Sequence, residues 1–293
     1  MKLLFKFDFA NGWGDTFLSL FDIVNCINYV KENYPNFYII FLINDNNSVD
    51  TLKLVLDFEF FNQISDEFNV LSKDSLFKNL NGIGWYKNEK FSRIYSGRNE
   101  DTKNNIPGIF DVFCLESNLN EIINLNIPFL NFTFNDIDDR VEYFPIFNKN
   151  LINLANDFIK DNFNSGFESI YFRALNPLNY ENIDSFKNKL SKFVSKEKKY
   201  FMCSNSSLVK KIILDEGYNV IFFRNFKDHN LDHIPNGFTV FGQTVEDAIF
   251  PVTEMIILGE SSKIIYSGDI QNVSLFNWYA INIKKVNLEN IIL

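Results

Sequence analysis

Short apolar runs alternate with longer amphipathic stretches along this chain, and this alternation constrains the fold more than any other feature. Runs of strand length occur at residues 2–8, 37–43 and 168–172, and apolar residues recur with a helical period from Asp15 to about Glu32. Strands separated by helices are typical of βαβ units, which form parallel sheets. The sequence therefore predicts an α/β fold.

The chain is expected to form two domains, because 293 residues exceed what most single cores enclose. The alternation breaks between residues 135 and 150, where acidic and turn-forming residues replace it. We place the boundary there and predict an N-terminal domain of residues 1–145 and a C-terminal domain of residues 146–293.

The remaining predicted elements follow the same pattern. In the first half, strands are expected at 109–114 and 127–134, and the polar, weakly periodic stretch 79–105 is expected to be a loop. In the second half, strands are expected at 200–203, 219–223 and 263–266, and helices are expected to begin at 151, 182, 206, 244 and about 274. This half predicts a doubly wound nucleotide-type domain.

Composition excludes several classes of protein. A net charge of −9 argues against a nucleic-acid partner, because phosphate backbones are bound by clustered Lys and Arg. The apolar runs are too short to span a bilayer, and Lys6 and Asp8 interrupt the first run, which favours a strand over a signal peptide. Three widely spaced cysteines, Cys26, Cys114 and Cys203, indicate a reducing compartment. We expect a cytoplasmic protein, of unspecified oligomeric state.

A glycine-containing loop, Asn11-Gly12-Trp13-Gly14-Asp15, follows the first strand and precedes the first helix. Its glycines allow a ligand to approach the backbone, and the start of a helix favours negative charge. The alternative is structural, with Asp15 serving only as the helix N-cap.

Polar residues also follow two strands of the second half. Arg173 and Asn176 come after the strand at 168–172, where a guanidinium can bind phosphate oxygens or pair structurally with a carboxylate. Ser204 and Asn205 follow the next strand, where their side chains can contact a nucleobase or cap a helix.

The predicted last helix opens with Ser274, Leu275 and Phe276. Unpaired N–H groups at a helix start, together with the Ser274 hydroxyl, form a natural seat for a diphosphate. The aromatic side chain of Phe276 is expected to pack rather than to bind.

Two patterns raise the question of a metal ion. His229 and His233 are spaced four apart, but the surrounding turn residues predict a loop rather than a helical metal site. Asp136 and Asp138 could hold a divalent cation that bridges a diphosphate, although acidic residues in a solvated linker explain them equally well. We predict no metal site.

In chain order these motifs resemble the fucosyltransferase superfamily of GT-B fold, which includes rhizobial nodulation α1,6-fucosyltransferases and protein O-fucosyltransferases. The similar segments are Gly12–Leu20, Tyr171–Asn176, Phe201–Asn205 and Ser274–Ala280. Three positions depart from the family's pattern: Tyr171 replaces its usual histidine, Ala174 stands where several members have a second arginine, and Asn176 stands in for aspartate.

The resemblance implies two Rossmann-like doubly wound domains facing across a cleft, with the acceptor on the N-terminal side and the donor on the C-terminal side. It implies inverting, metal-independent transfer of a sugar, with fucose from GDP-fucose as the expected donor and a glycan as acceptor, and no required cofactor. Arg173 would stabilise the leaving diphosphate, and Asp15 would be the base. The alternatives are a metal-dependent GT-A enzyme using Asp136 and Asp138, and a non-catalytic module that binds a sugar nucleotide or a glycan.

Overall fold

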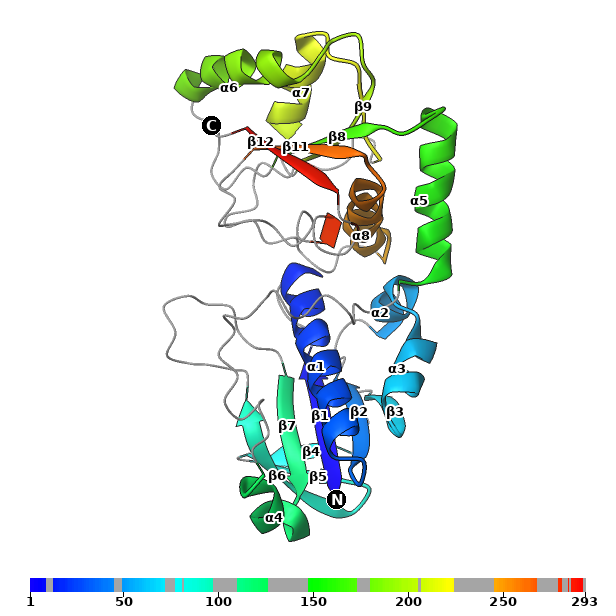
Figure 1. Ribbon diagram of the computed structural model, residues 1–293, viewed down its shortest axis with the longest axis vertical. Coiled ribbons are helices and arrows are strands. Elements are labelled where there is room, and N and C mark those ends of the chain that lie inside the picture. Colours follow the sequence, from blue (N-terminus) through cyan, green and yellow to red (C-terminus); the bar gives the residue numbers. More distant parts are fainter. Residues whose placement is uncertain are drawn as a thin grey trace. The chain divides into compact units, whose positions relative to one another are not determined.

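The computed structural model divides the chain into two compact units, Met1–Asn148 and Lys149–Leu293. The division lies close to the boundary placed between residues 145 and 146. The residues described are 1–8, 13–44, 49–71, 77–80, 82–96, 110–125, 147–172, 180–204, 207–223, 245–267, 279–280, 284 and 286–291. Each unit contains one sheet with its own helices (Figure 1).

The N-terminal unit is built on a seven-stranded sheet with the order β3-β2-β1-β7-β6-β5-β4. Its strands are β1 (Lys2–Asp8), β2 (Tyr38–Asn44), β3 (Glu67–Leu71), β4 (Lys78–Leu80), β5 (Ile83–Tyr86), β6 (Glu89–Ser96) and β7 (Phe110–Leu115). β1, β2 and β3 are mutually parallel, whereas β7 runs antiparallel to β1, and β6, β5 and β4 continue the antiparallel pattern. The sheet is therefore mixed, and its antiparallel half differs from the doubly wound sheet expected.

Helices cover one face of this sheet. The helices of the unit are α1 (Trp13–Asn33), α2 (Val49–Val55), α3 (Phe58–Ile64) and α4 (Leu119–Ile123), the last preceded by a 3-10 turn (Glu116–Asn118). The ring of Phe41 in β2 packs on Phe61 of α3 at a centroid distance of 5.2 Å. Because side chains alternate along a strand, the odd-numbered residues of β1 and β2 form this helix-covered face. Leu3, Phe5 and Phe7 are fully buried there.

The other face of the sheet, here called the inner face, is covered by the antiparallel strands themselves. Its apolar core combines residues from the parallel and antiparallel halves: Leu4, Ile40, Leu42, Leu71, Phe77, Tyr86, Phe91 and Phe113. β3 and β5 lie far apart in the strand order, yet Tyr86 of β5 shares this core with Leu71 of β3. The sheet thus curls over its own inner face and buries it, with no contribution from a helix in the part of the chain that the structure describes.

The expected loop at 79–105 was wrong wherever the structure describes that stretch. β4, β5 and β6 pair as successive antiparallel strands, and Lys87 and Asn88 join β5 to β6 with φ angles of 49° and 66°. Two consecutive positive φ values are typical of the two-residue turn that matches the twist of a hairpin. These strands escaped sequence reasoning because most of β6 and part of β5 are half-buried or exposed, which weakens their apolar alternation.

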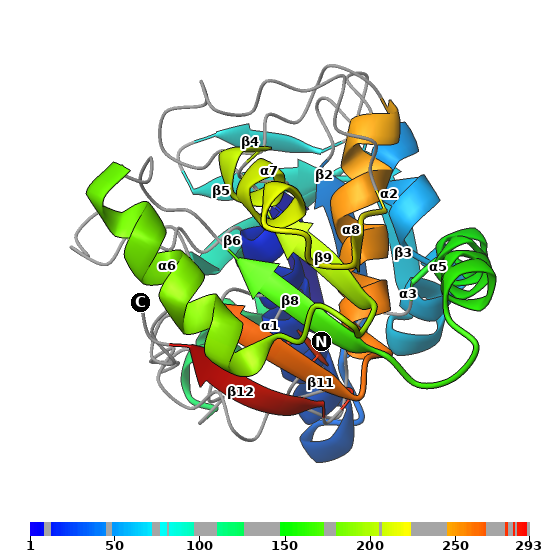
Figure 2. The same ribbon diagram turned by 90° about the horizontal axis from the view of Figure 1, so that it is seen from above.

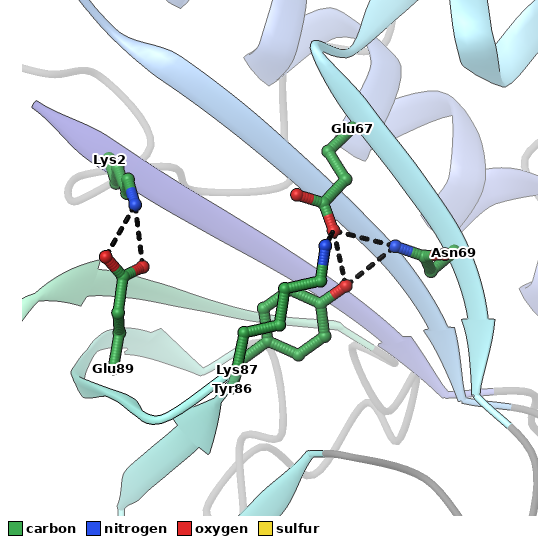
Figure 3. A network of polar contacts seen from close by, with 6 residues as sticks. All are labelled: Lys2, Glu67, Asn69, Tyr86, Lys87 and Glu89. Carbon is green, nitrogen blue, oxygen red and sulfur yellow. Dashed lines mark hydrogen bonds and ion pairs between the residues drawn. The ribbon is translucent and has the colours of Figure 1, made fainter.

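Polar contacts close the curl at the amino ends of the parallel strands (Figure 3). We call this group the amino-edge clasp; its members are Lys2, Glu67, Asn69, Tyr86, Lys87 and Glu89. Lys2 donates to both carboxylate oxygens of Glu89, over 2.6 and 2.7 Å. The Oε1 atom of Glu67 accepts from the Tyr86 hydroxyl at 2.5 Å, from Lys87 at 2.5 Å and from Asn69 at 2.8 Å. The clasp therefore ties the hairpin of β5 and β6 to β1 and β3.

The C-terminal unit contains a five-stranded sheet with the order β10-β9-β8-β11-β12, in which every neighbouring pair is parallel. Its strands are β8 (Glu168–Phe172), β9 (Tyr200–Ser204), β10 (Val220–Ile221), β11 (Lys263–Ser267) and β12 (Asn287–Ile291). Figure 2 shows β9, β8, β11 and β12 side by side. This order, with the first strand of the unit in the centre, is that of a doubly wound sheet.

Helices lie on both faces of this second sheet. They are α5 (Lys149–Asn162), α6 (Tyr180–Phe193), α7 (Ser207–Asp215) and α8 (Val245–Gly259). Figure 1 shows α6 and α7 on one side of the strands and α8 on the other. Ile170, Met202 and Ile265 pack with residues of α6 and α7 on the first face. On the opposite face, the ring of Phe158 in α5 meets Phe201 of β9 at 5.8 Å.

Most predicted elements of the C-terminal half are confirmed, including the strands at 168–172, 200–203 and 263–266. The predicted strand at 127–134 lies outside the described residues, and of the helix predicted from about 274 only Tyr279 and Ala280 are described, within a helical turn. None of the described helices combines the length and apolar character that a membrane span requires.

Candidate functional site

Four of the five parallel strands of the C-terminal unit, β8, β9, β11 and β12, end level with one another. In register, Phe172 of β8 lies beside Ser204 of β9 and beside Ser267 of β11, and Ser267 lies beside Ile291 of β12. The segments that follow these residues therefore start from a single edge of the sheet. In open α/β sheets this carboxyl edge is where ligands bind.

The direction of winding reverses beside β8. From β8 the chain proceeds to β9 and β10 on one side, and then returns to β11 and β12 on the other. α6, which follows β8, lies on one face of the sheet, and α8, which precedes β11, lies on the other. In open α/β sheets, ligands bind outside the strand ends where the winding reverses in this way. Phe172 is the last residue of β8, and the sequence continues directly into Arg173.

Only one predicted residue of this edge has a described side chain. Ser204 is buried, with 7% of its surface exposed, and is the last residue of β9. The other predicted donor-site residues of this unit lie outside the described residues: Arg173, Asn176, Asn205, Ser274, Leu275 and Phe276. Their roles stay predictions.

A buried polar contact lies just behind the edge, on the α8 face. The Cys203 thiol of β9 donates to Oε2 of Glu254 in α8 over 3.3 Å. Cys203 pairs in register with Tyr171, whose ring stacks on Tyr266 at 5.8 Å, and both tyrosines are buried. Glu254 is only 7% exposed. Sequence reasoning missed Glu254; its signal is a single carboxylate in the otherwise apolar run Pro251–Leu258.

The predicted glycine loop follows β1 in the sequence, and its first two residues, Asn11 and Gly12, lie outside the described residues. β1 ends at Asp8, and α1 begins at Trp13, two residues earlier than predicted. Gly14 and Asp15 therefore fall in the first turn of α1, and Asp15 is not its N-cap. A carboxylate is favoured in a first turn because it faces the positive end of the helix dipole.

A charged group that sequence reasoning did not identify lies at the carboxyl edge of the N-terminal unit's sheet, on the inner face. We call it the carboxyl-edge layer; its members are Lys6, Asp8, Asn44, Arg93 and Asp111. Lys6 donates to Oδ1 and Oδ2 of Asp8 at 2.8 and 2.9 Å, and the Asn44 amide donates to Asp8 Oδ1 at 2.6 Å. Asp111 lies beside Lys6 in register, 1% exposed, with Arg93 Nη1 at 3.7 Å from its Oδ1. The Lys6 ammonium also lies over the ring of Phe77 at 5.7 Å.

A signal for this layer was present in the sequence. Lys6 and Asp8 are two residues apart in an apolar strand and must therefore share a face of the sheet. Asn44, in turn, is the last residue of the neighbouring strand and pairs with Asp8 in register. Asp111 could not be placed in the same layer from the sequence, because its pairing with Lys6 depends on β7 joining β1.

No metal-binding group emerges from the described ranges, where no three His, Cys, Asp or Glu side chains come together. Asp136, Asp138, His229 and His233, the residues weighed as metal ligands, lie outside those ranges. Any requirement for a metal is therefore a matter for experiment.

Comparisons with known proteins were made at the level of sequence and of structure. No protein-family model matches the chain, and no curated protein matches it. Among solved structures, it is similar to NodZ α-1,6-fucosyltransferase soaked with GDP-fucose, with 11% identity, a TM-score of 0.44 and coverage of 96% of this chain and 92% of that chain. It is also similar to POFUT1 in complex with GDP, with 7% identity, a TM-score of 0.45 and coverage of 99% and 97%. NodZ from Bradyrhizobium, described as a fucosyltransferase, gives 11% identity, a TM-score of 0.42 and coverage of 96% and 93%.

Proposed function

We propose that the chain is a glycosyltransferase that uses a nucleotide-sugar donor, and that its C-terminal unit binds the donor diphosphate through Arg173. The observation that carries the proposal is the strand order β10-β9-β8-β11-β12. It makes β8, the strand that Arg173 follows, the strand beside which the winding reverses. Ser204, the last residue of the adjacent strand β9, supports the proposal that the donor binds at the same edge.

The chemistry of the reaction explains why an arginine suits this position. When the sugar leaves, the nucleotide diphosphate gains negative charge, so fixed positive groups stabilise the transition state more than the ground state. A guanidinium presents a planar fork of donors that matches two phosphate oxygens. The N–H groups of Ser274, Leu275 and Phe276 would add donors from a helix start. With these groups the reaction needs no metal ion, and the motifs favour GDP-fucose as the donor.

The acceptor is proposed to be a glycan hydroxyl that attacks with inversion. A hydroxyl is a weak nucleophile until a base removes its proton, and a carboxylate held beside it can do so. Asp15, in the first turn of α1, is the carboxylate that the motifs assign to this step. We propose that the N-terminal unit holds the acceptor.

A second candidate function is a non-catalytic module that binds a sugar nucleotide. One observation favours it: Tyr171, at the position where the resembling family has histidine, is 6% exposed and stacked on Tyr266. A buried, stacked tyrosine contributes to the core and is poorly placed to contact substrate. Binding of a nucleotide without hydrolysis or transfer would identify this second function.

The first experiment is a thermal-shift screen of the whole chain with GDP, UDP, CDP and TDP and their common sugars, with and without EDTA. A ligand at about 100 times its Kd stabilises a protein by about 2.7 kcal/mol, which raises the melting temperature measurably. We expect GDP and GDP-fucose to stabilise the chain equally in EDTA and in Mg²⁺. Stabilisation that requires Mg²⁺ would favour the metal-dependent GT-A alternative with Asp136 and Asp138.

The second experiment compares three variants. Arg173→Ala should weaken GDP binding and GDP-fucose turnover, and Arg173→Lys should restore part of both because it keeps the charge and loses the fork. Lys198→Ala is the matched control, since Lys198 pairs with Glu168 at the opposite end of β8, over 2.5 Å, and is 45% exposed. It should behave as wild type. If Arg173→Ala binds GDP and turns over donor within a few-fold of wild type, the proposed role of Arg173 is wrong.

A further inference from the structure

The inner face of the seven-stranded sheet has charged groups at both ends and an apolar core between them. At the amino edge, the ion pairs and hydrogen bonds of the clasp cross from the parallel strands to the hairpin, as from Lys2 to Glu89 (Figure 3). The contacts of the clasp therefore join the two layers of the sheet at the amino edge. The carboxyl-edge layer is organised differently, because its shortest contacts run within β1 and between β1 and β2.

Asp8 and Asn44 form the strand-end part of the carboxyl-edge layer, in which the Arg93 side chain is also exposed, at 36%. They are the final residues of adjacent parallel strands and lie beside each other in register. The Asp8 side chain is 14% exposed, and Asn44 is half-buried. Among the described residues, the Asn44 amide donates to Asp8 and its amide oxygen accepts no hydrogen bond. The pair thus presents a carboxylate and an amide in a fixed relation at the edge where ligands of α/β sheets bind.

The surroundings hold the Asp8 carboxylate in place. Lys6 contacts both of its oxygens, and the Lys6 side chain is only 7% exposed, so the ammonium cannot swing into solvent without losing its packing. A binding group held by its neighbours loses little conformational entropy when a ligand arrives, which favours affinity.

The charges of the layer select the kind of ligand. Lys6 and Arg93 carry two positive charges and Asp8 and Asp111 two negative ones, so the layer is neutral as a whole, and each cation lies beside a carboxylate. An anionic ligand would meet two carboxylates whose cations are already engaged. A hydroxyl both donates and accepts, so a pair of neighbouring hydroxyls can donate to Asp8 and accept from or donate to the Asn44 amide.

We propose that Asp8 and Asn44 bind neighbouring hydroxyl groups of a neutral sugar, and that this is how the N-terminal unit holds its acceptor. The assignment rests on the proposed function, because it takes the glycan acceptor from there. It adds the class of acceptor, an uncharged polyhydroxylated sugar, and two residues outside the motifs on which the proposed function depends.

Ligand-observed NMR on the whole chain tests the proposal. The probes are the methyl glycosides of glucose, galactose, mannose and N-acetylglucosamine, with the methyl glycoside of glucuronic acid as the anionic counterpart. At least one neutral glycoside should bind, and the glucuronide should bind more weakly than the glucoside. Asp8→Asn and Asn44→Ala should each weaken binding about tenfold, because Asp8→Asn removes the charge of a hydrogen-bond acceptor and Asn44→Ala removes the amide that contacts the sugar.

Glu89→Gln is the matched control. It makes the same kind of change as Asp8→Asn, on the same face of the same sheet but at the opposite edge, where Glu89 pairs with Lys2. Binding of the neutral glycoside should be unchanged. The proposal is overturned if no neutral glycoside binds the wild-type chain, if the glucuronide binds more tightly, or if Glu89→Gln weakens binding as much as Asp8→Asn. If Asp8→Asn does not fold, Asn44→Ala decides the matter.

The outcome separates this proposal from the proposed function. Donor nucleotides test the C-terminal unit, whereas simple glycosides without donor test the carboxyl-edge layer. Sugar binding that depends on Asp8, in a chain that binds no nucleotide, would refute the transferase and leave the layer as a sugar site. Nucleotide binding and donor turnover with no glycoside binding would refute the sugar site and support the transferase.

Discussion

Lys6 and Asp8, two residues apart in β1, form an ion pair in which the ammonium contacts both carboxylate oxygens, at 2.8 and 2.9 Å. Their side chains are only 7% and 14% exposed. Taking two charges out of water costs several kcal/mol per ion, and a well-packed apolar pair would fill such a position at least as well. The location of the pair at the carboxyl end of β1 therefore favours a role in binding over a role in stability.

A double-mutant cycle should measure this pair. Lys6→Met and Asp8→Asn should each destabilise the chain, and the double variant should lose less than the sum, with a coupling free energy of about 1–3 kcal/mol. The measurement is the free energy of unfolding in urea for the four proteins. Additive losses would mean that the two charges do not stabilise each other.

The amino-edge clasp should contribute to stability through Glu67. Glu67→Gln removes a charge that accepts hydrogen bonds from Tyr86, Lys87 and Asn69, and should cost about 1–2 kcal/mol. Lys87→Ala should cost less than about 0.5 kcal/mol, because the Lys87 side chain is 52% exposed and solvent screens its charge. Equal losses in urea unfolding for the two variants would show that the buried partners of Glu67 do not matter.

The same carboxylate should make stability depend on pH. Burial disfavours the charged form of Glu67, but the hydrogen bonds from Lys87 and Tyr86 outweigh it and lower the pKa of Glu67 below its ordinary value of 4.5. A folded-state pKa below the unfolded one stabilises the fold above pH 4.5, and this stabilisation is lost as the pH falls through the folded pKa. The difference in unfolding free energy between wild type and Glu67→Gln should therefore shrink on acidification. A difference that grew or stayed constant would contradict the assignment.

The three thiols should be unreactive in the native state. Cys26, Cys114 and Cys203 are buried and unpaired with one another, and burial raises the pKa of Cys114 to about 11. Because the thiolate is the reactive form, Cys114 stays protonated at pH 8. Ellman's reagent should label the three cysteines only after denaturation. Rapid labelling of Cys114 in the folded chain would place it outside the core.

Gly84 should resist substitution because of Phe77. A Cβ at Gly84 would lie 2.7 Å from Cε2 and Cζ of Phe77, whose ring packs against Phe113 with centroids 5.5 Å apart. Gly84→Ala should therefore cost about 1–3 kcal/mol through overpacking. A Cβ at Gly166 would meet nothing within 4 Å, so Gly166→Ala should change stability by less than about 0.5 kcal/mol. Thermal unfolding of the two variants, compared with wild type, checks the contrast.

Local sequence was sufficient for the parallel strands. β2, β8, β9 and β11 contain apolar runs because they are buried on both faces, and β1 contains one that Lys6 interrupts. α1 shows a helical period because one side packs on the sheet. Such runs can be recognised as strands from their own residues, whatever the rest of the chain contacts. The position of Arg173 after a buried strand could be read in the same way, as could the change of pattern before residue 149.

The hairpins of β4, β5 and β6 could not be recognised so easily, because much of their length faces solvent on one side or both. Their strongest local signal is the turn at Lys87 and Asn88, whose sequence is not one of the glycine-containing pairs that usually mark a two-residue hairpin. What makes them strands is the inner face of β1 and β2, which no helix of the described residues covers. This inner face has to be covered only after β1, β2 and β3 have paired into the parallel half of the sheet.

The sequence alone determined that the chain is α/β, which runs are its central strands, and which polar residues follow them. The tertiary structure alone decided the strand order, the curl of the N-terminal sheet and the meeting of Lys6, Asp8, Asn44 and Asp111. The physical reason is that burial on both faces is recorded in consecutive residues, whereas the register of β7 on β1 joins residues about a hundred positions apart. A contact of that kind depends on which edge remains available after the neighbouring strands have paired.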